Sequence, residues 1–163
     1  MPRRIRNEHR AAMNASDNVT PPNLDNIIAE GKLFYVQGNA NKAVKTVLKS
    51  LREAGHVKGG PIPKPSEKAF AFQMIGKGFL GERDYSTAAE VLKKSLALAP
   101  SDMETLYLLA TALRRGDAMV AAEEALSKAR SRFENTDIWQ RAWAEYLIEA
   151  GRLEEAAAAA RQA

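Results

Sequence analysis

The sequence predicts an all-α fold, specifically an α-solenoid of about four helix-turn-helix repeats. Apolar residues recur at steps of three and four, which is the spacing that places side chains on one face of a helix. Short polar turns that contain glycine interrupt these stretches. The same pattern then returns along the chain at a period of 34 residues, and such self-similarity is the signature of a repeat architecture.

The clearest unit spans residues 69–102. One face of its first helix carries Phe72, Ile75, Gly76 and Phe79, at steps of three, one and three. Because Gly76 has no side chain, a neighbouring helix can approach its backbone closely, and we expect the small Ala88 of the second helix to face this gap. The turn between the helices is predicted at residues 81–84. Pro100 is expected to end the second helix and Ser101 to cap the next one.

Shifting this unit along the chain reveals three further copies. A shift of 34 residues moves Gly76 onto Ala110, a second shift reaches Ala144, and a shift of 45 residues backwards reaches Gly31. The alanine of the second helix recurs in the same way, at Ala43, Ala88, Ala122 and Ala156. The positions that repeat are those at which two helices interlock, so four helix pairs are predicted, with extra residues at the first junction.

These residues resemble the tetratricopeptide repeat family. The family motif has a small residue at position 8, filled here by Gly31, Gly76, Ala110 and Ala144, and alanine at position 20. Tyr85 at position 17 and Pro100 at position 32 of the second repeat also match. The resemblance covers residues 24–163 and implies a solenoid that binds other proteins. The departures lie in the end repeats, at Glu30 and Gln140.

The domain organisation follows from these patterns. Residues 1–22 are read as a flexible basic arm, and residues 23–163 as one domain with repeats at about 24–57, 69–102, 103–136 and 137–163. The proline- and glycine-rich junction 55–66 is expected to be a loop, either a spacer or a flap that contacts a partner. In the fourth repeat we expect Trp143 and Leu147 to pack inward. An uncapped last repeat would leave an apolar end for a partner, a second copy or a further domain.

The resemblance implies that the first helices of successive repeats line a concave groove. Positions 2, 5, 9 and 12 of these helices share one face, at steps of three, four and three. The predicted partner-binding residues are Ile28, Lys32, Tyr35, Phe70, Gln73, Lys77, Leu80, Tyr107, Arg114 and Arg141. This mixture of apolar, aromatic and basic side chains suits a peptide with apolar and acidic residues. Repeats two and three are expected to set partner choice through Gln73, Lys77, Tyr107 and Arg114.

Charge and composition favour a binding protein over an enzyme. The formal net charge is +4, and residues 1–68 carry all of the excess positive charge. This basic front half fits an acidic partner, or charge that only maintains solubility. The two histidines, His9 and His56, have no spaced ligands around them, and no nucleophile motif is present. We therefore expect no catalytic residues, metal or cofactor.

Two other functions stay open at this stage. The basic front half could bind nucleic acid, although acids interleave with the predicted groove cations. The chain could also be the scaffold of a larger enzyme. The sequence has no cysteine, no apolar run long enough for a membrane span and no secretory signal. A cytoplasmic adaptor, assembly factor or chaperone-like protein is therefore the main expectation.

Overall fold

The structure is a computed structural model that describes residues 23–60 and 62–162. The basic arm predicted for residues 1–22 lies outside the described residues, as do Pro61 and Ala163. The described residues form helices joined by turns and loops, with no strand among them. The predicted all-α class is confirmed.

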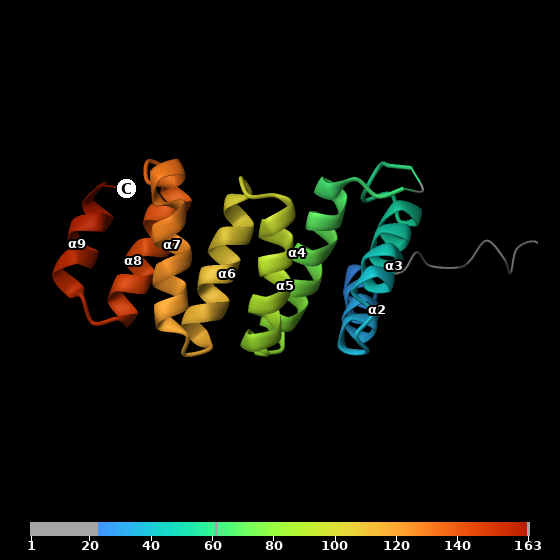
Figure 1. Cartoon of the computed structure of the whole chain (residues 1–163), viewed down its shortest axis with the longest axis horizontal. Helices are drawn as coiled ribbons and strands as arrows, with labels where there is room; N and C mark the ends of the chain where they lie inside the picture. The colour runs from blue at the N-terminus through green and yellow to red at the C-terminus, as the bar shows by residue number, and fades with distance from the viewer. Residues whose placement is uncertain (1–22, 61, 163) are drawn as a thin grey trace, which may run out of the picture.

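The helices follow one another as four pairs. Their bounds are α2 Leu24–Val36, α3 Ala40–Glu53, α4 Pro65–Gly81, α5 Tyr85–Leu98, α6 Met103–Arg115, α7 Met119–Phe133, α8 Asp137–Glu149 and α9 Leu153–Gln162. Each pair is an antiparallel hairpin closed by a short turn, and the pairs are arranged in a row along the long axis of the molecule (Figure 1).

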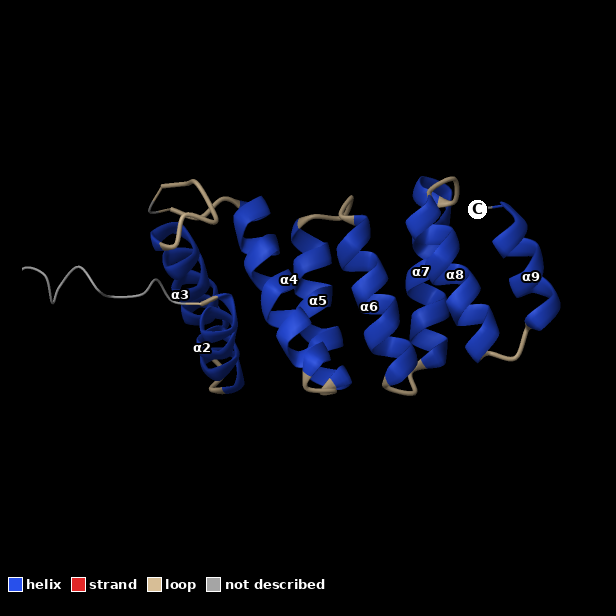
Figure 2. Ribbon diagram, turned by 180° about the vertical axis from the view of Figure 1, so that it is seen from behind, coloured by secondary structure: helices blue, strands red, loops and turns tan. Residues whose placement is uncertain are grey.

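Contacts between neighbouring pairs are regular. The first helix of each pair (α2, α4, α6, α8) packs on the next first helix, and each second helix also packs on the first helix of the following pair. Figure 2 shows the same row from behind. The apolar core therefore runs along the row instead of filling a central point, which is the arrangement of an α-solenoid.

Close approach at the small residues joins the two helices of a pair. A Cβ atom placed on Gly76 would lie 2.7 Å from Leu92 Cγ, which is too close for two carbon atoms. The side chain that fills the gap at Gly76 is thus Leu92, and the expectation of Ala88 at this point was wrong, although Ala88 is fully buried nearby. Gly31 receives Val47 in the same manner, sixteen residues later in each case.

The turn inside each pair contains one left-handed residue at an equivalent position. These residues are Gly38, Arg83, Asp117 and Gly151, with φ angles of 79°, 63°, 60° and 76°. Only the outer repeats use glycine there. In the middle repeats, the neighbouring Gly81 and Gly116 do not take the left-handed conformation, so they mark the turns without being their strained residues.

Two helix starts differ from the sequence-based expectation. Helix α4 begins at Pro65, whose missing N–H costs nothing in the first turn, so the last two residues of the predicted 55–66 loop are helical. Helix α6 is capped by Asp102 instead of Ser101, and the Asp102 carboxylate accepts a 3.2 Å hydrogen bond from the Thr105 backbone N–H.

The fourth pair buries a different helix face from the one expected. Leu147 is buried as predicted, but Trp139 and Tyr146 are more deeply buried than Trp143. Trp143 is partly exposed, with its ring stacked between Trp139 and Tyr146 at centroid distances of 5.5 and 5.3 Å. Helix α8 packs on α6, α7 and α9, and no later helix among the described residues covers its remaining side. Its buried face is therefore turned toward the preceding pair.

Candidate partner-binding surface

The ten predicted groove residues all lie on first helices, namely α2, α4, α6 and α8. Their surroundings differ widely. Tyr35, Gln73 and Arg114 are buried, Phe70 and Arg141 are exposed, and the other five are partly buried. We use the term first-helix face for the surface that these residues and their neighbours at positions 2, 5, 9 and 12 form.

Gln73 belongs to a buried polar network between the second and third pairs. Its side-chain amide donates to Thr105 Oγ1 at 3.0 Å and to Asp102 Oδ2 at 3.2 Å. The Thr105 hydroxyl donates to Asp102 at 3.0 Å, and Ser95 donates to the Ala69 carbonyl at 2.7 Å. Gln73 is only 4% exposed, so its polar group serves the packing of α4 on α6 and is not free to select a partner.

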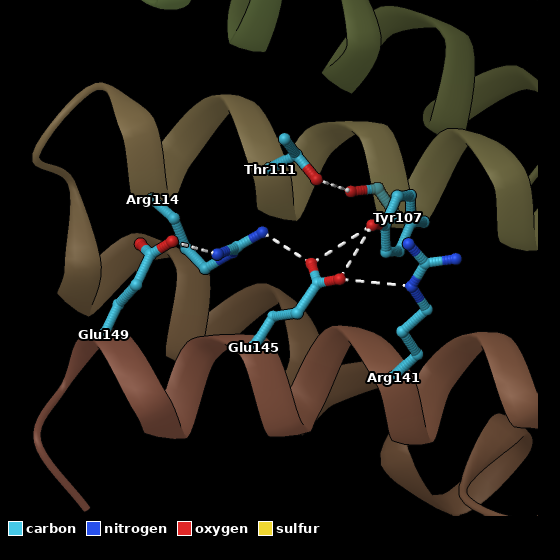
Figure 3. Close-up of polar contacts among 6 residues, drawn as sticks. All are labelled: Tyr107, Thr111, Arg114, Arg141, Glu145 and Glu149. Atoms are coloured by element: carbon cyan, nitrogen blue, oxygen red, sulfur yellow. Dashed lines mark hydrogen bonds and ion pairs between the residues drawn. The ribbon is translucent and has the colours of Figure 1, made fainter.

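Arg114 lies at the centre of a second network, between the third and fourth pairs (Figure 3). Its guanidinium donates to Glu145 Oε2 at 2.8 Å and also to Glu149. The side chain is only 6% exposed, and its Nε has no partner among the described residues. The expectation that Arg114 reads a partner directly is therefore at odds with its burial, because a charge in this position must remain paired with these carboxylates.

Tyr107 and Arg141 complete this second network. The Tyr107 hydroxyl donates to both carboxylate oxygens of Glu145 at 3.0 and 3.1 Å, and Arg141 Nε donates to Glu145 at 3.1 Å (Figure 3). Burial, followed by the Glu145 carboxylate, raises the pKa of Tyr107, because both disfavour the phenolate. The hydrogen bond to Glu145 raises the pKa of Arg141. Glu145 thus accepts hydrogen bonds from both α6 and α8.

The remaining predicted cations pair with acids that follow them in the sequence. Lys77 Nζ lies 2.6 Å from Glu104 of the next pair, and Lys32 pairs with Glu82 in the α4–α5 turn. Tyr35 on α2 donates 2.8 Å to Glu90 on α5; burial, then Glu90, raises the pKa of this tyrosine. Most polar groups predicted to grip a partner therefore link one helix pair to the next.

The predicted face still exposes large apolar side chains. Phe70 is 40% exposed, Ile138 42% and Ile148 55%. Phe70 lies three residues before Gln73, and the two isoleucines flank Arg141 and Glu145 at helical spacing, so all three belong to the first-helix face. Two apolar regions therefore border a polar central region whose side chains bind one another.

The measurable clefts lie elsewhere on the molecule. The largest, about 480 Å³, is bordered by α5 and α7, and side chains of α6, including Leu106, Leu109 and Leu113, line it. Another, of about 450 Å³, is lined by residues of α7, α8 and α9. None of the ten predicted residues lines any of the five clefts measured in the described part of the chain. The first-helix face is thus shallow, and a partner on it would contact a surface instead of a deep pocket.

The search for metal-binding groups and membrane spans covered residues 23–60 and 62–162. It found no group of three or more histidine, aspartate or glutamate side chains placed to hold a metal ion. His56 is exposed in the junction, and His9 lies outside the described residues. None of the helices in these ranges combines the length and apolar character required to cross a membrane.

Sequence reasoning missed the acidic half of these networks. Glu104, Glu145 and Glu149 were not predicted to form part of the site, although each binds a predicted residue. A signal was present, since Glu104 and Glu145 occupy positions 2 and 9 of the same helix face as the cations. Opposite charges interleaved on one face can indicate pairing across repeats as well as attraction of a partner.

Comparisons with known proteins agree with this architecture. Residues 79–146, from the end of α4 to α8, match the family model described as tetratricopeptide repeat. The solved structure of the MamA RS-1 ArsTM double mutant matches with a TM-score of 0.53 and 21% identity, covering 86% of this chain and 72% of that chain. A second MamA mutant gives a TM-score of 0.49 and 19% identity, covering 86% and 76%. No protein with a curated description matches. The resemblance to tetratricopeptide repeat proteins is thereby confirmed.

Proposed function

We propose that this tetratricopeptide repeat chain is a non-catalytic scaffold that binds a peptide or partner protein on its first-helix face, as an assembly factor or chaperone-like protein. The observation that supports the proposal is the exposure of Phe70, Ile138 and Ile148 on a face whose polar groups are mostly paired with one another. Large apolar side chains exposed together mark interaction surfaces more often than they occur on free surfaces.

The proposed division of labour on this face separates anchoring from positioning. Phe70 at one end and Ile138 with Ile148 at the other would bury apolar area against the partner, and such anchors carry most of the energy in many interfaces. Between them, the Arg114 and Gln73 networks hold successive helix pairs at a constant spacing. The partner would therefore meet a preformed surface and lose less conformational freedom on binding.

The partly exposed cations give the partner its orientation in this proposal. Lys77 and Arg141 each pair with one carboxylate, but their side chains are 38% and 71% exposed, so both can also reach an acid on a partner. Ile28 and Leu80 are partly buried beside them and would extend the apolar contact. Tyr35, Gln73 and Arg114 take part indirectly, since they set the positions of the helices.

A comparative capture experiment tests the proposal. The double variant Phe70→Ser with Ile148→Ser removes one anchor at each end of the first-helix face. The matched control, Val120→Ser with Leu153→Ser, removes two apolar side chains that are 82% and 64% exposed on second helices. We expect proteins retained by the wild type to be lost by the anchor variant and kept by the control, with circular dichroism unchanged in both.

Two results would contradict the proposal. Retention of the same proteins by the anchor variant would exclude the first-helix face as the binding surface. Equal loss in the control would mean that capture depends on exposed apolar area anywhere on the chain, and not on this face. Quantitative mass spectrometry of the retained proteins distinguishes the three outcomes.

A further inference from the structure

A second surface stands out where α3 meets the junction loop and the start of α4. Two neighbouring clefts lie there, of about 410 and 290 Å³, and both are lined by Lys45 and Pro63. The junction loop arches beside the ends of α3 and α4 (Figure 1). The cations that line the two clefts are Lys45, Lys49, Arg52 and Lys68, and we call them the α3 basic face.

The charges of the α3 basic face are largely unneutralised, unlike those of the first-helix face. Within the described ranges, Lys45 and Lys68 form no ion pair, and Lys49 reaches Glu53 only at 3.8 Å. Arg52 donates to the carbonyl oxygens of Leu48 and Gly60, which carry no formal charge. Residues 40–68 contain seven lysine and arginine residues against two glutamates. The excess positive charge of the chain is thus concentrated here in space as well as in sequence.

The Arg52 contacts also give this surface a defined shape. Hydrogen bonds to the α3 carbonyl of Leu48 and to Gly60 of the junction connect the helix to the loop. The guanidinium is thereby held at the edge of the larger cleft while its charge stays available to an anion. A charged group held in place loses less side-chain entropy when it binds than a free lysine does.

The smaller cleft adds an apolar pocket beside these cations. Val44 and Phe72, both buried, line it together with Pro63 and the 84% exposed Ile62. Its volume of about 290 Å³ suits one large side chain of a partner. Lys45 and Lys68 stand at the same cleft, so an apolar side chain inserted there would have acidic neighbours close to both ammonium groups.

We propose that the α3 basic face is a second partner site, which binds an acidic peptide segment carrying one apolar anchor side chain. Charge complementarity selects acids, and the pocket formed by Val44, Phe72 and Ile62 selects the anchor. A single-stranded nucleic acid would require exposed aromatic rings for base stacking, whereas the only aromatic ring lining the two clefts, Phe72, is 8% exposed. Since α3 is a second helix, this site lies apart from the first-helix face.

The test uses a labelled peptide of glutamates and aspartates around a central leucine, with binding followed by fluorescence anisotropy. The site variant is Lys45→Glu with Lys49→Glu and Lys68→Glu. The matched control reverses three exposed cations on other helices, Lys93→Glu, Arg115→Glu and Arg161→Glu, and therefore changes the net charge equally. We expect the site variant to bind at least about tenfold more weakly and the control to retain wild-type affinity at physiological salt.

Further probes check each part of the proposal. A peptide with glutamine and asparagine in place of the acids, and one with alanine in place of leucine, should both bind more weakly. A uridine oligonucleotide and phosphatidylserine vesicles should bind less tightly than the acidic peptide. The proposal is overturned if the acidic peptide fails to bind the wild type or if the control variant loses binding equally. Tighter, site-dependent binding of the oligonucleotide or the vesicles would also overturn it. The first-helix face is intact in all these variants, so the outcome is independent of the capture experiment above.

Discussion

Two successive interfaces along the row of helix pairs are held together by different chemistry. Between the second and third pairs, Gln73, Thr105 and Ser95 form a buried network around one carboxylate, that of Asp102. Between the third and fourth pairs, Arg114 binds Glu145 and Glu149, whose side chains are 29% and 41% exposed. Both networks lie where one first helix packs on the next, so the repeat geometry is the same while the polar groups differ.

The difference indicates how each interface depends on solvent. The first network consists mainly of neutral donors and acceptors enclosed in the protein, so salt should affect it little. The second places a buried guanidinium against carboxylates at the surface, so its strength depends on ionic screening and on keeping both acids. The central interface should therefore remain rigid over a wide range of conditions, whereas the interface near the C-terminal pair should respond to the solution.

The largest effect is expected at Arg114. Arg114→Ala leaves Glu145 and Glu149 without their shared cation and removes a buried side chain, which should lower the free energy of unfolding by about 3 kcal/mol. Urea denaturation followed by circular dichroism measures the loss. The control is Arg115→Ala, an exposed neighbour on the same helix, for which less than about 0.5 kcal/mol is expected. Equal effects of the two substitutions would show that the Arg114 network does not hold the interface.

A smaller loss is expected at Thr105, which is fully buried in the central network. Thr105→Val keeps the volume but removes the hydroxyl that binds Asp102 and Gln73, at a cost of about 2 kcal/mol in unfolding free energy. Thr111→Val is the matched control, because that hydroxyl binds only the Tyr107 carbonyl of its own helix. The Thr105 loss should be the same in low and high salt. A loss that varies strongly with salt would remove the contrast between the two interfaces.

The smallest effect is expected in the turns and has the opposite sign. Arg83→Gly should stabilise the protein by about 1 kcal/mol, because a side chain with a φ of 63° is strained and glycine is not. Asp117→Gly should give a smaller gain, since aspartate tolerates the left-handed region better than arginine. Thermal unfolding of both variants, with Gly81→Ala for comparison, measures the order. Destabilisation by Arg83→Gly would mean that the arginine side chain contributes contacts that outweigh the strain.

The sequence was sufficient to predict the fold but not the details of its turns and caps. Apolar spacing and the small residues at Gly31 and Gly76 were enough to predict paired helices, because those positions must lie against a neighbour in any packed arrangement. Glycine near a turn indicated where the chain reverses. It could not show that Arg83 or Asp117 takes the left-handed conformation, since that depends on how the two helices are joined.

The candidate site was harder to predict for a similar reason. Helical spacing placed Lys77 and Arg114 correctly on one face of their helices, but it gave no information about which groups of the next pair reach them. The distance between successive first helices decides whether a cation faces solvent or a carboxylate. That distance depends on the packing of side chains such as Leu106 and Leu109 between helices, which no single helix pattern contains.

The central claim is that the charges on the first-helix face hold the helix pairs together and do not select the partner. Exchanging Lys77 and Glu104 tests it most directly, because Lys77→Glu with Glu104→Lys keeps the ion pair while inverting its local charges. We expect unfolding free energy within about 0.5 kcal/mol of the wild type, and the same proteins retained in the capture experiment. A stable, folded exchange variant that no longer retains those proteins would show that the partner reads these charges, and would contradict the claim.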